Sequence, residues 1–187
     1  DCGKLATPSA AGCTAVLKPS EMGALQPRIV TEALHEAGAP AGVFNIVTGR
    51  GDVVGAEIVG SPDIAKISFT GSTAVGKGIV RASADTLKRV TLELGGKSPT
   101  VILDDADFEA AVPLALNAGF VNSGQACIAG TRILVPRARL ADFEVRVTAL
   151  ANATVSGDPL NPETQIGPMV SRRQWERVQG YIRKGIE

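Results

Sequence analysis

The sequence has little of several features that would point to particular functions. Its 19 lysines and arginines balance 19 aspartates and glutamates, so the net charge is zero when its one histidine is neutral. This balance excludes a strongly basic nucleic-acid-binding protein and gives no support to a polybasic membrane anchor. Aromatic residues make up only 4% of the chain, which argues against a surface that stacks the bases of single strands.

Paired cysteines and long apolar runs are also missing. Cys2, Cys13 and Cys127 are an odd number and form no C-x-x-C pair, so neither a disulfide framework nor a zinc site is predicted, and no metal site is expected. We therefore expect a reducing, cytoplasmic location. No run of 18 apolar residues exists, so no transmembrane helix is expected. The chain starts at Asp1 without a signal peptide pattern, and we expect it to be cut from within a longer protein.

Short apolar strands alternate with helical segments along the chain, a pattern typical of an α/β fold with a parallel sheet. The expected strands are residues 13–17, 43–47, 65–69, 87–94, 100–103 and 131–135. The expected helices are residues 21–37, 52–59, a segment ending near 84, 107–120, 139–151, and a last one from about 171. Pro27 predicts a kink or a late start in the first of these helices. A lobe boundary is expected near residues 95–96.

Residues 69–76 (FTGSTAVG) place a glycine turn between a strand and a helix start. The free backbone N–H groups of the helix start and its dipole favour an anion, and Ser72 adds a hydroxyl donor, so the turn suits a pyrophosphate. It is not a G-x-G-x-x-G motif, and a capped helix start of any α/β protein is the alternative.

Lys18 and Glu21 (KPSE) follow the first expected strand, and Ser20 is an expected helix cap. At the carboxyl end of a parallel strand, a carboxylate can accept hydrogen bonds from ribose hydroxyls, and a lysine can donate to the sugar or to a phosphate. A solvated lysine and a glutamate at a helix start are the alternative.

Two further residues could carry chemistry. Glu93 ends an apolar strand, where a partly desolvated carboxylate could act as a general base; a strand-end glutamate facing water is the alternative. Cys127 lies in a glycine-containing loop before a strand and is a candidate nucleophile, with a buried structural thiol as the alternative. The only histidine, His35, is expected on a helix surface, which disfavours a Cys–His protease. Cys13 is expected to be buried in its strand.

Six motifs in this order resemble the NAD(P)-dependent aldehyde dehydrogenase superfamily, and the resemblance covers essentially the whole chain. The motifs are residues 10–21, 44–49, 69–77, 90–99, 122–132 and 157–168. Glu93 and Cys127 are 34 residues apart, as the base and the nucleophile of that family typically are. The resemblance implies part of a Rossmann-like cofactor domain over residues 1–95 and the first half of an α/β catalytic domain over residues 96–187.

The resemblance also implies a mechanism and a cofactor site. The Cys127 thiolate would attack an aldehyde, hydride would pass to the nicotinamide to leave a thioester, and Glu93 would activate the hydrolysing water. The Cys127 backbone N–H would form half of an oxyanion hole. The positions that match the cofactor contacts are Lys18, Ser20, Glu21, Gly49, Thr70, Gly71, Ser72, Val75, Leu94 and Gly95.

Glu21 would repel a 2′-phosphate, so NAD is favoured, while Lys18 leaves NADP use open. A parent enzyme acting on a small aldehyde, and forming a homodimer or homotetramer, is expected.

Family members are roughly two to three times as long as this chain. The oxyanion-hole asparagine and the glutamate on the nicotinamide ribose would lie outside it, so we expect the 187 residues alone to be inactive or nearly so. The alternatives are a non-catalytic piece that keeps partial dinucleotide binding, an acylating relative that forms an acyl-coenzyme A, and a protein with a structural role. The presence of Glu93 favours hydrolysis over acyl transfer.

Overall fold

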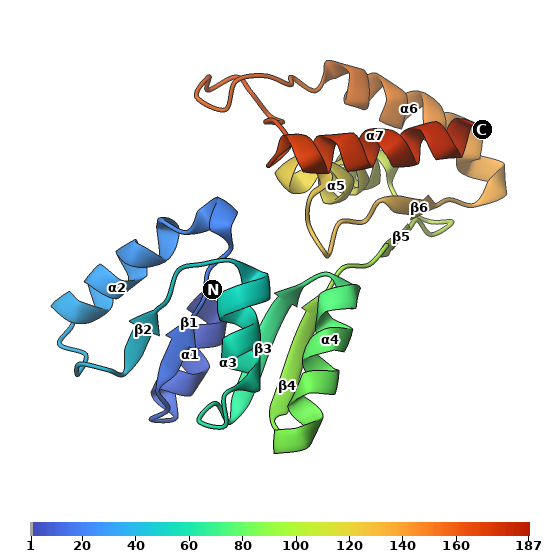
Figure 1. Cartoon of the computed structure of the whole chain (residues 1–187). Helices are drawn as coiled ribbons and strands as arrows, with labels where there is room; N and C mark the ends of the chain where they lie inside the picture. Colours follow the sequence, from blue (N-terminus) through green and yellow to red (C-terminus); the bar gives the residue numbers. More distant parts are fainter. Residues whose placement is uncertain (1) are drawn as a thin grey trace. The chain divides into compact units, whose positions relative to one another are not determined.

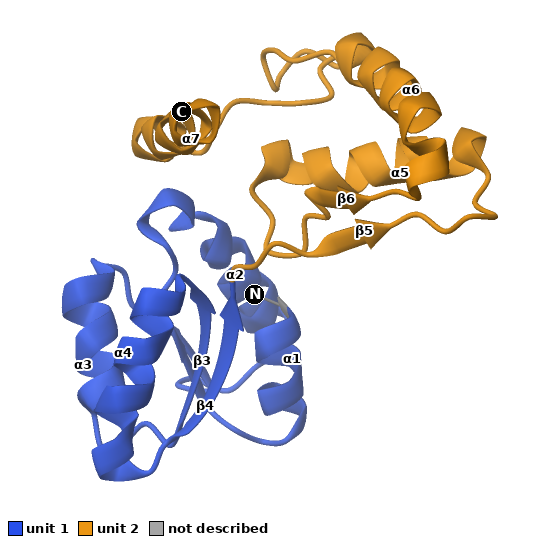
Figure 2. Cartoon of the chain, turned by 90° about the vertical axis from the view of Figure 1, so that its right-hand side faces the viewer, with its two compact units in different colours: residues 1–94 blue, residues 95–187 orange. Residues whose placement is uncertain are grey.

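The computed structural model describes residues 2–187, which form two compact units that meet in the sequence at Leu94 and Gly95 (Figure 2). Both units alternate helices with short strands, and every strand pair is parallel. The expected α/β class with parallel strands is therefore confirmed. The assignment of cofactor binding to residues 1–95 and of catalysis to residues 96–187 stays a prediction.

Unit 1 carries its strands in two parallel pairs rather than in one continuous ladder (Figure 1). Its helices and strands are α1 (Cys2–Ala10), β1 (Ala15–Leu17), α2 (Gln26–Glu36), β2 (Phe44–Ile46), α3 (Ala56–Gly60), β3 (Lys66–Gly71), α4 (Thr73–Ser83) and β4 (Arg89–Leu94). Short 3-10 or π turns are η1 (Glu21–Gly23), η2 (Gly51–Gly55) and η3 (Ala84–Thr86). Strand β1 pairs with β2, and β3 pairs with β4.

Helix α4 packs against β3 and β4 through its most buried face (Figure 1). Gly76 and Ile79 are buried on this face, and Ile67 of β3 is buried as well. A Cβ atom at Gly76 would lie 2.9 Å from Leu94 Cδ2, which is closer than van der Waals contact allows. The glycine therefore lets the first half of α4 approach the end of β4 closely.

One helix of unit 1 was not expected from the sequence. Helix α1 contains Pro8, and prolines normally disfavour a helix interior because they lack the backbone N–H. Leu5 of this helix lines a small hollow together with Leu17 of β1 and Pro27 and Val30 of α2. Tertiary packing of this kind can support a helix whose local sequence does not predict it.

Four local expectations need correction or refinement. The segment 21–37 splits into η1 and α2, and Pro27 lies in the first turn of α2, where its missing N–H breaks no helical hydrogen bond. The helix expected over residues 52–59 is the π turn η2 followed by α3, and Asp52 pairs with Arg50, the residue at the cap position of η2. Cys13 is exposed and precedes β1, so it is not buried in a strand. Leu87 is left-handed (φ 51°) and exposed, so β4 begins only at Arg89.

Unit 2 encloses a contiguous hydrophobic core. Its elements are β5 (Pro99–Val101), α5 (Phe108–Phe120), η4 (Val121–Gly124), β6 (Arg132–Leu134), η5 (Arg137–Arg139), α6 (Leu140–Ala153) and α7 (Arg172–Ile186). Strand β5 pairs with β6 in parallel. The core consists of Ile102, Phe108, Val112, Ala115 and Phe143. The rings of Phe108 and Phe143 meet edge to face with centroids 5.5 Å apart, a favoured aromatic geometry.

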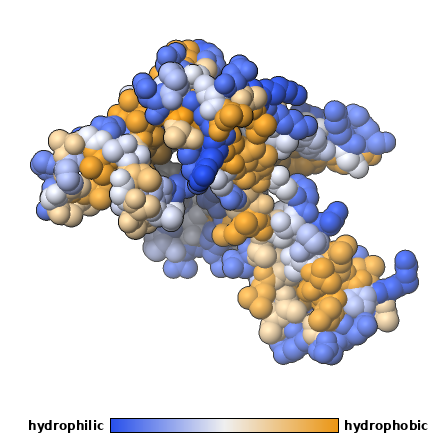
Figure 3. Space-filling model, turned by 90° about the horizontal axis from the view of Figure 1, so that it is seen from below, coloured by the Kyte–Doolittle hydropathy of each residue, from blue (hydrophilic) through white to orange (hydrophobic). Residues whose placement is uncertain are grey.

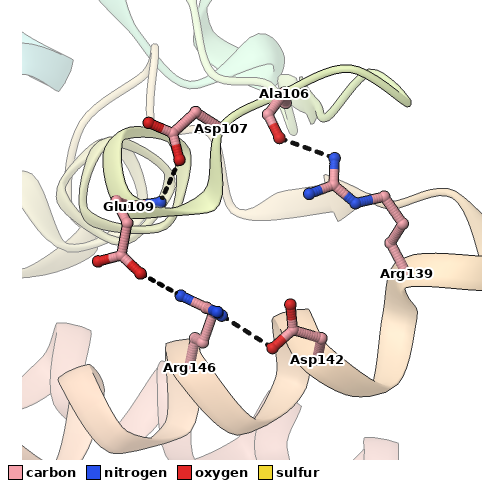
Figure 4. Close-up of polar contacts among 6 residues, drawn as sticks. All are labelled: Ala106, Asp107, Glu109, Arg139, Asp142 and Arg146. Atoms are coloured by element: carbon pink, nitrogen blue, oxygen red, sulfur yellow. Dashed lines mark hydrogen bonds and ion pairs between the residues drawn. The ribbon is translucent and has the colours of Figure 1, made fainter.

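Polar contacts outside this core join α5, α6 and the loop before α5 (Figure 4). Asp107 caps α5 by accepting a hydrogen bond from the Glu109 N–H at 3.0 Å. Arg146 of α6 pairs with Asp142 at 2.8 Å and with Glu109 of α5. The Arg139 guanidinium donates to the Ala106 carbonyl at 2.7 Å. The exposed Arg146–Glu109 pair links α6 to α5, and the Arg139 bond links η5 to the loop before α5.

The surface is not uniformly polar. On the face seen in Figure 3, hydrophobic atoms form several patches between hydrophilic ones. The most exposed large apolar side chains include Leu25, Leu87, Ile128, Leu160 and Ile186. No helix within residues 2–187 combines the length and the apolar character that crossing a bilayer requires.

Candidate cofactor site and catalytic residues

The carboxyl ends of β1 and β2 bring four of the sequence-predicted cofactor residues together. Leu17 pairs with Ile46, so the segments that follow these residues leave the ladder side by side. The half-buried Lys18 donates to the Gly49 carbonyl at 3.3 Å and to the Pro19 carbonyl. The Glu21 carboxylate accepts a hydrogen bond from the Gly51 N–H at 2.9 Å. Lysine, carboxylate and two backbone segments thus converge at the end of one strand pair.

The Glu21 carboxyl group is held in its charged form. A hydrogen bond from its own backbone N–H, a second from the Gly51 N–H and the positive charge of Lys18 lower the pKa of Glu21 below its ordinary value. Ser20 is used differently, because its Oγ accepts from the Met22 N–H at 3.3 Å and caps η1, as the sequence predicts. The exposed Glu21 carboxylate keeps free lone pairs and can accept further hydrogen bonds.

Gly49 is required by the backbone of this cluster. Its φ of 152° lies in a region that other residues rarely adopt, and a Cβ atom there would lie 2.5 Å from Val54 Cγ2. The carbonyl that Lys18 contacts is therefore held by a turn that a larger residue would disturb. Sequence reasoning missed the Gly51 N–H as the partner of Glu21, although the glycine-rich run 49–51 signals an irregular backbone.

A second group of predicted cofactor residues lies where β3 and β4 end. Thr70 pairs with Glu93 and Gly71 with Leu94 along the ladder. Ser72 then caps α4, its Oγ accepting from the Val75 N–H at 3.3 Å. The first turn of a helix leaves N–H groups without helical partners, so the start of α4 presents donors to an anion.

The remaining members of this second group are partly or fully exposed to solvent. Val75 is half exposed, and Gly95 is exposed after the end of β4. Leu94 is half-buried against Gly76. The Thr70 hydroxyl accepts a hydrogen bond from Lys4 of α1, a contact that sequence reasoning missed together with the helix itself.

Glu93 does not have the burial expected of it. Along β4 the half-buried residues alternate with exposed ones, and Glu93 falls on the exposed face. The period of two along a strand explains this result, because Leu92 and Leu94 take the inward positions on either side. The expected partial desolvation of this carboxylate is therefore wrong for the described residues. Its position opposite Thr70, at the end of a parallel strand, is as the sequence predicts.

Cys127 is also exposed, so the buried-thiol alternative does not describe it. It lies between η4 and β6 in a turn closed by the hydrogen bond from the Ala129 N–H to the Ala126 carbonyl at 3.1 Å. Before the turn, Asn122 and Ser123 both have left-handed backbones, with φ of 53° and 57°. Non-glycine residues in strained backbone regions cost on the order of 1–3 kcal/mol each and concentrate at functional sites.

Within residues 2–187, no three histidine, cysteine, aspartate or glutamate side chains gather as metal ligands. The candidate groups of unit 1 instead combine one carboxylate, one lysine, hydroxyls and backbone N–H groups. This donor set suits a ligand with ribose hydroxyls and phosphates. Unit 2 contributes an exposed thiol in a tight turn.

The aldehyde dehydrogenase family model matches residues 2–187. The chain belongs to the aldehyde dehydrogenase family. The resemblance in the sequence motifs is thereby confirmed over nearly the whole chain, on both sides of the division between the two units.

Curated relatives of this aldehyde dehydrogenase chain are much longer than it is. A 3-succinoylsemialdehyde-pyridine dehydrogenase from Pseudomonas is 45% identical over 183 residues, which cover 98% of this chain and 38% of the relative. A betaine aldehyde dehydrogenase from Rhizobium etli is 47% identical over 184 residues, with the same coverage of 98% and 38%. The chain thus spans about 38% of the length of these curated relatives.

Solved structures of the family are equally similar. Aldehyde dehydrogenase C from Pseudomonas syringae, a cysteine-to-alanine variant in complex with NAD⁺ and octanal, is 48% identical with a TM-score of 0.94. The similarity covers 97% of this chain and 38% of that one. An NAD⁺ complex of an aldehyde dehydrogenase from Bacillus cereus is 46% identical with a TM-score of 0.94, covering 97% and 37%. Structural neighbours of the chain are therefore NAD⁺ complexes of aldehyde dehydrogenases.

Proposed function

We propose that the whole protein oxidises an aldehyde to a carboxylic acid with NAD, and that this chain contributes the nucleophile, the base and much of the cofactor site. The observation that carries the proposal is the 48% identity, across 97% of the chain, to an enzyme solved with both NAD⁺ and octanal. The polar groups at the strand ends of unit 1 support it independently, because their donor set fits a dinucleotide.

The residues of unit 1 would hold the cofactor at the two strand ends. Lys18 and Glu21 would contact the adenosine ribose, with Ser20 and Gly49 shaping the turns beside them. Gly71 and Ser72, which follow Thr70 and lead into α4, would donate to the pyrophosphate. The remaining contacts would be Val75 with the adenine, and Leu94 and Gly95 near the nicotinamide. When bound, NAD supplies the acceptor for the hydride that aldehyde oxidation releases.

In this proposal Cys127 is the catalytic nucleophile. Its thiolate forms a bond from Sγ to the aldehyde carbon, and the backbone N–H of Cys127 donates to the oxygen that becomes negative. The exposure of Cys127 in its turn supports this role, since a substrate carbon must reach Sγ. After oxidation the cysteine carries a thioester.

Glu93 is the proposed general base of the second half of the reaction. Its carboxylate takes a proton from water, the water oxygen attacks the thioester carbon, and the Cys127 Sγ leaves as the thiolate. The exposure of Glu93 on β4 leaves it open to water. A chain with this carboxylate favours hydrolysis over transfer of the acyl group to coenzyme A.

The test is NADH formation by the whole protein with a panel of aldehydes. Cys127→Ser is expected to lower kcat by about 10³-fold or more, because a nucleophile and its partners act as a unit. Cys13→Ser is the matched control, since Cys13 is also an exposed free thiol but lies before β1. Its kcat is expected to match that of the wild type, and a Cys127→Ser protein with full turnover would contradict the proposal.

We further propose that these 187 residues alone turn over aldehyde slowly or not at all, because they span about 38% of the relatives' length. The loss of a single oxyanion donor costs on the order of 10²–10³ in rate. Robust NADH formation by the isolated 187 residues would refute this point, and calorimetry with NAD would show whether they keep partial dinucleotide binding. A cytoplasmic location and a homo-oligomeric whole protein stay predictions.

A further inference from the structure

We propose that Gln125 and Ser123 are positioning residues that hold the Cys127 turn against the segment 167–170. This inference rests on the proposed function, because it explains how the nucleophile would be aimed. Neither residue was singled out by the sequence motifs as functional. All the contacts concerned lie within unit 2.

Gln125 joins the Cys127 loop to a distant part of the chain. Its side-chain Oε1 accepts a hydrogen bond from the Val170 N–H at 3.1 Å, across 45 residues of sequence. Its Nε2 donates to the Asn122 carbonyl at 3.3 Å, and the Asn122 side chain donates back to the Gln125 carbonyl at 3.2 Å. The Gln125 side-chain amide thus bonds to its own loop through Nε2 and to the segment 167–170 through Oε1.

Ser123 makes a second, independent link between the same two segments. Its hydroxyl donates to the Gly167 carbonyl at 2.9 Å, across 44 residues. Ser123 reaches this carbonyl from a left-handed backbone conformation, which it shares with Asn122. Such conformations persist only where surrounding contacts hold them, and the bond to Gly167 is a contact of that kind.

The other end of the Cys127 loop is fixed by the backbone. The Gly130 N–H donates to the Ala118 carbonyl of α5 at 3.0 Å, and the Thr100 hydroxyl of β5 donates to the Gly130 carbonyl at 3.1 Å. Gly130 is buried, and a Cβ atom there would lie 2.2 Å from Thr100 Oγ1. The downstream end of the loop is therefore anchored without help from Gln125 or Ser123.

Cys127 stands between these two anchors, at the second position of the turn 126–129. If the upstream anchor is released, the turn can pivot about its fixed downstream end, and Sγ moves with it. A displacement of about 1 Å at a reacting atom can cost about 10²-fold in rate. The two side-chain links would therefore act on the rate of attack by Cys127 and leave the cofactor residues of unit 1 untouched.

The closing experiment compares variants of the whole protein in the first turnover of NADH formation. Gln125→Met removes both hydrogen bonds of the amide at nearly constant volume and is expected to slow the first turnover by about 10- to 100-fold. The KM for NAD should stay within about twofold of the wild-type value. Mispositioning of Cys127 changes only the first-turnover rate, whereas a general loss of structure would change both the rate and the KM. Ser123→Ala should give a change in the same direction.

A control variant and the Ser123→Ala variant separate positioning from general destabilisation. Gln165→Met is the matched control, because the Gln165 side chain also accepts a backbone N–H, from Val155 at 2.9 Å, which lies outside the Cys127 loop. It should turn over like the wild type. Ser123→Ala removes the other link of the same anchor and keeps the Gln125 amide, so it tests the positioning role even if Gln125→Met folds poorly.

The outcomes are distinct. Equal first-turnover rates in Gln125→Met and Gln165→Met, or a Ser123→Ala protein as fast as the wild type, would overturn the positioning role. A wild-type protein that oxidises no aldehyde would overturn the proposed function itself, and with it this inference.

Discussion

Unit 1 and unit 2 hold their candidate residues by different means. In unit 1, Lys18, Glu21 and Ser72 lie where parallel strands end or where a helix begins, so strand pairing and a helix start bring them into place, and the side chains of Lys18 and Glu21 then bond to the run 49–51. In unit 2, Cys127 lies in an irregular loop whose shape depends on side-chain bonds from Ser123 and Gln125 to a segment more than 40 residues away. We therefore expect the loss of one of these side chains to disturb the Cys127 loop more than the strand ends of unit 1.

The two units also differ in their cores. The described hydrophobic residues that are buried in unit 1 are Ile67 and Ile79, whereas unit 2 has a contiguous cluster centred on Phe108 and Phe143. Free energy of unfolding should therefore depend more on single core residues in unit 2 than in unit 1. The predictions below test this contrast, beginning with the largest effect.

Phe143→Ala is expected to lower the free energy of unfolding by about 3–5 kcal/mol, because it removes a buried ring and leaves a cavity against Phe108. The measurement is urea denaturation of the whole protein, read by a unit 2 probe such as Trp175 fluorescence. Val145→Ala is the control on the same helix α6, where the side chain is 70% exposed, and should change the free energy by less than about 0.5 kcal/mol. Equal denaturation midpoints for the two variants would contradict the core described for unit 2.

Two helix caps, one in each unit, test the comparison with a smaller expected change in unfolding free energy. Ser72 caps α4 in unit 1, and Asp107 caps α5 in unit 2, each accepting one backbone N–H. Ser72→Ala and Asp107→Ala should each cost about 1 kcal/mol of unfolding free energy. Only Ser72→Ala should also weaken NAD binding, measured by calorimetry, because only that cap lies in the proposed pyrophosphate site. Weaker NAD binding in Asp107→Ala at matched stability would argue against the separation of roles.

The sequence predicted well what local patterns determine. The strands around Leu17, Ile46 and Phe69 and the cap at Ser20 follow from apolar runs, turns and hydroxyl residues close along the chain. The family motifs then identified most of the candidate site. The predictions failed where distant packing decides: α1 forms despite Pro8, and Cys13 is exposed outside its expected strand.

The contacts around the Cys127 loop were missed for the same reason. No spacing rule relates Gln125 to Val170 or Ser123 to Gly167, because the loops between them fold back irregularly. The exposure of Glu93 could have been predicted from the sequence, since strand alternation places Leu92 and Leu94 on the inner face and Glu93 on the outer one. A motif indicates which residue matters, whereas burial follows from the face on which the residue falls.

Glu21→Gln tests the cofactor preference of unit 1. Two unit charges about 4 Å apart in water interact with about 1 kcal/mol, so removing the carboxylate should improve the affinity for NADP relative to NAD by about fivefold. The measurement is the ratio of the two dissociation constants. Glu57→Gln is the control, because Glu57 is an exposed glutamate on α3 outside the Lys18 cluster. A ratio that changes equally in both variants would show that Glu21 has no special role in discrimination.

The smallest expected effect is the titration of Glu21. Its pKa is lowered by its own backbone N–H, by the Gly51 N–H and by Lys18, so its NMR titration midpoint should lie below that of the same carboxyl group in the urea-unfolded protein. Because the folded pKa is the lower one, the carboxylate stabilises the fold above its ordinary pKa, and this stabilisation disappears as the pH falls through the folded pKa. Lys18→Met should raise the Glu21 midpoint part of the way back, since the backbone hydrogen bonds remain. An unchanged midpoint in Lys18→Met would mean that the charge of Lys18 does not act on the Glu21 carboxylate, and that the two side chains at this strand end are not electrostatically coupled.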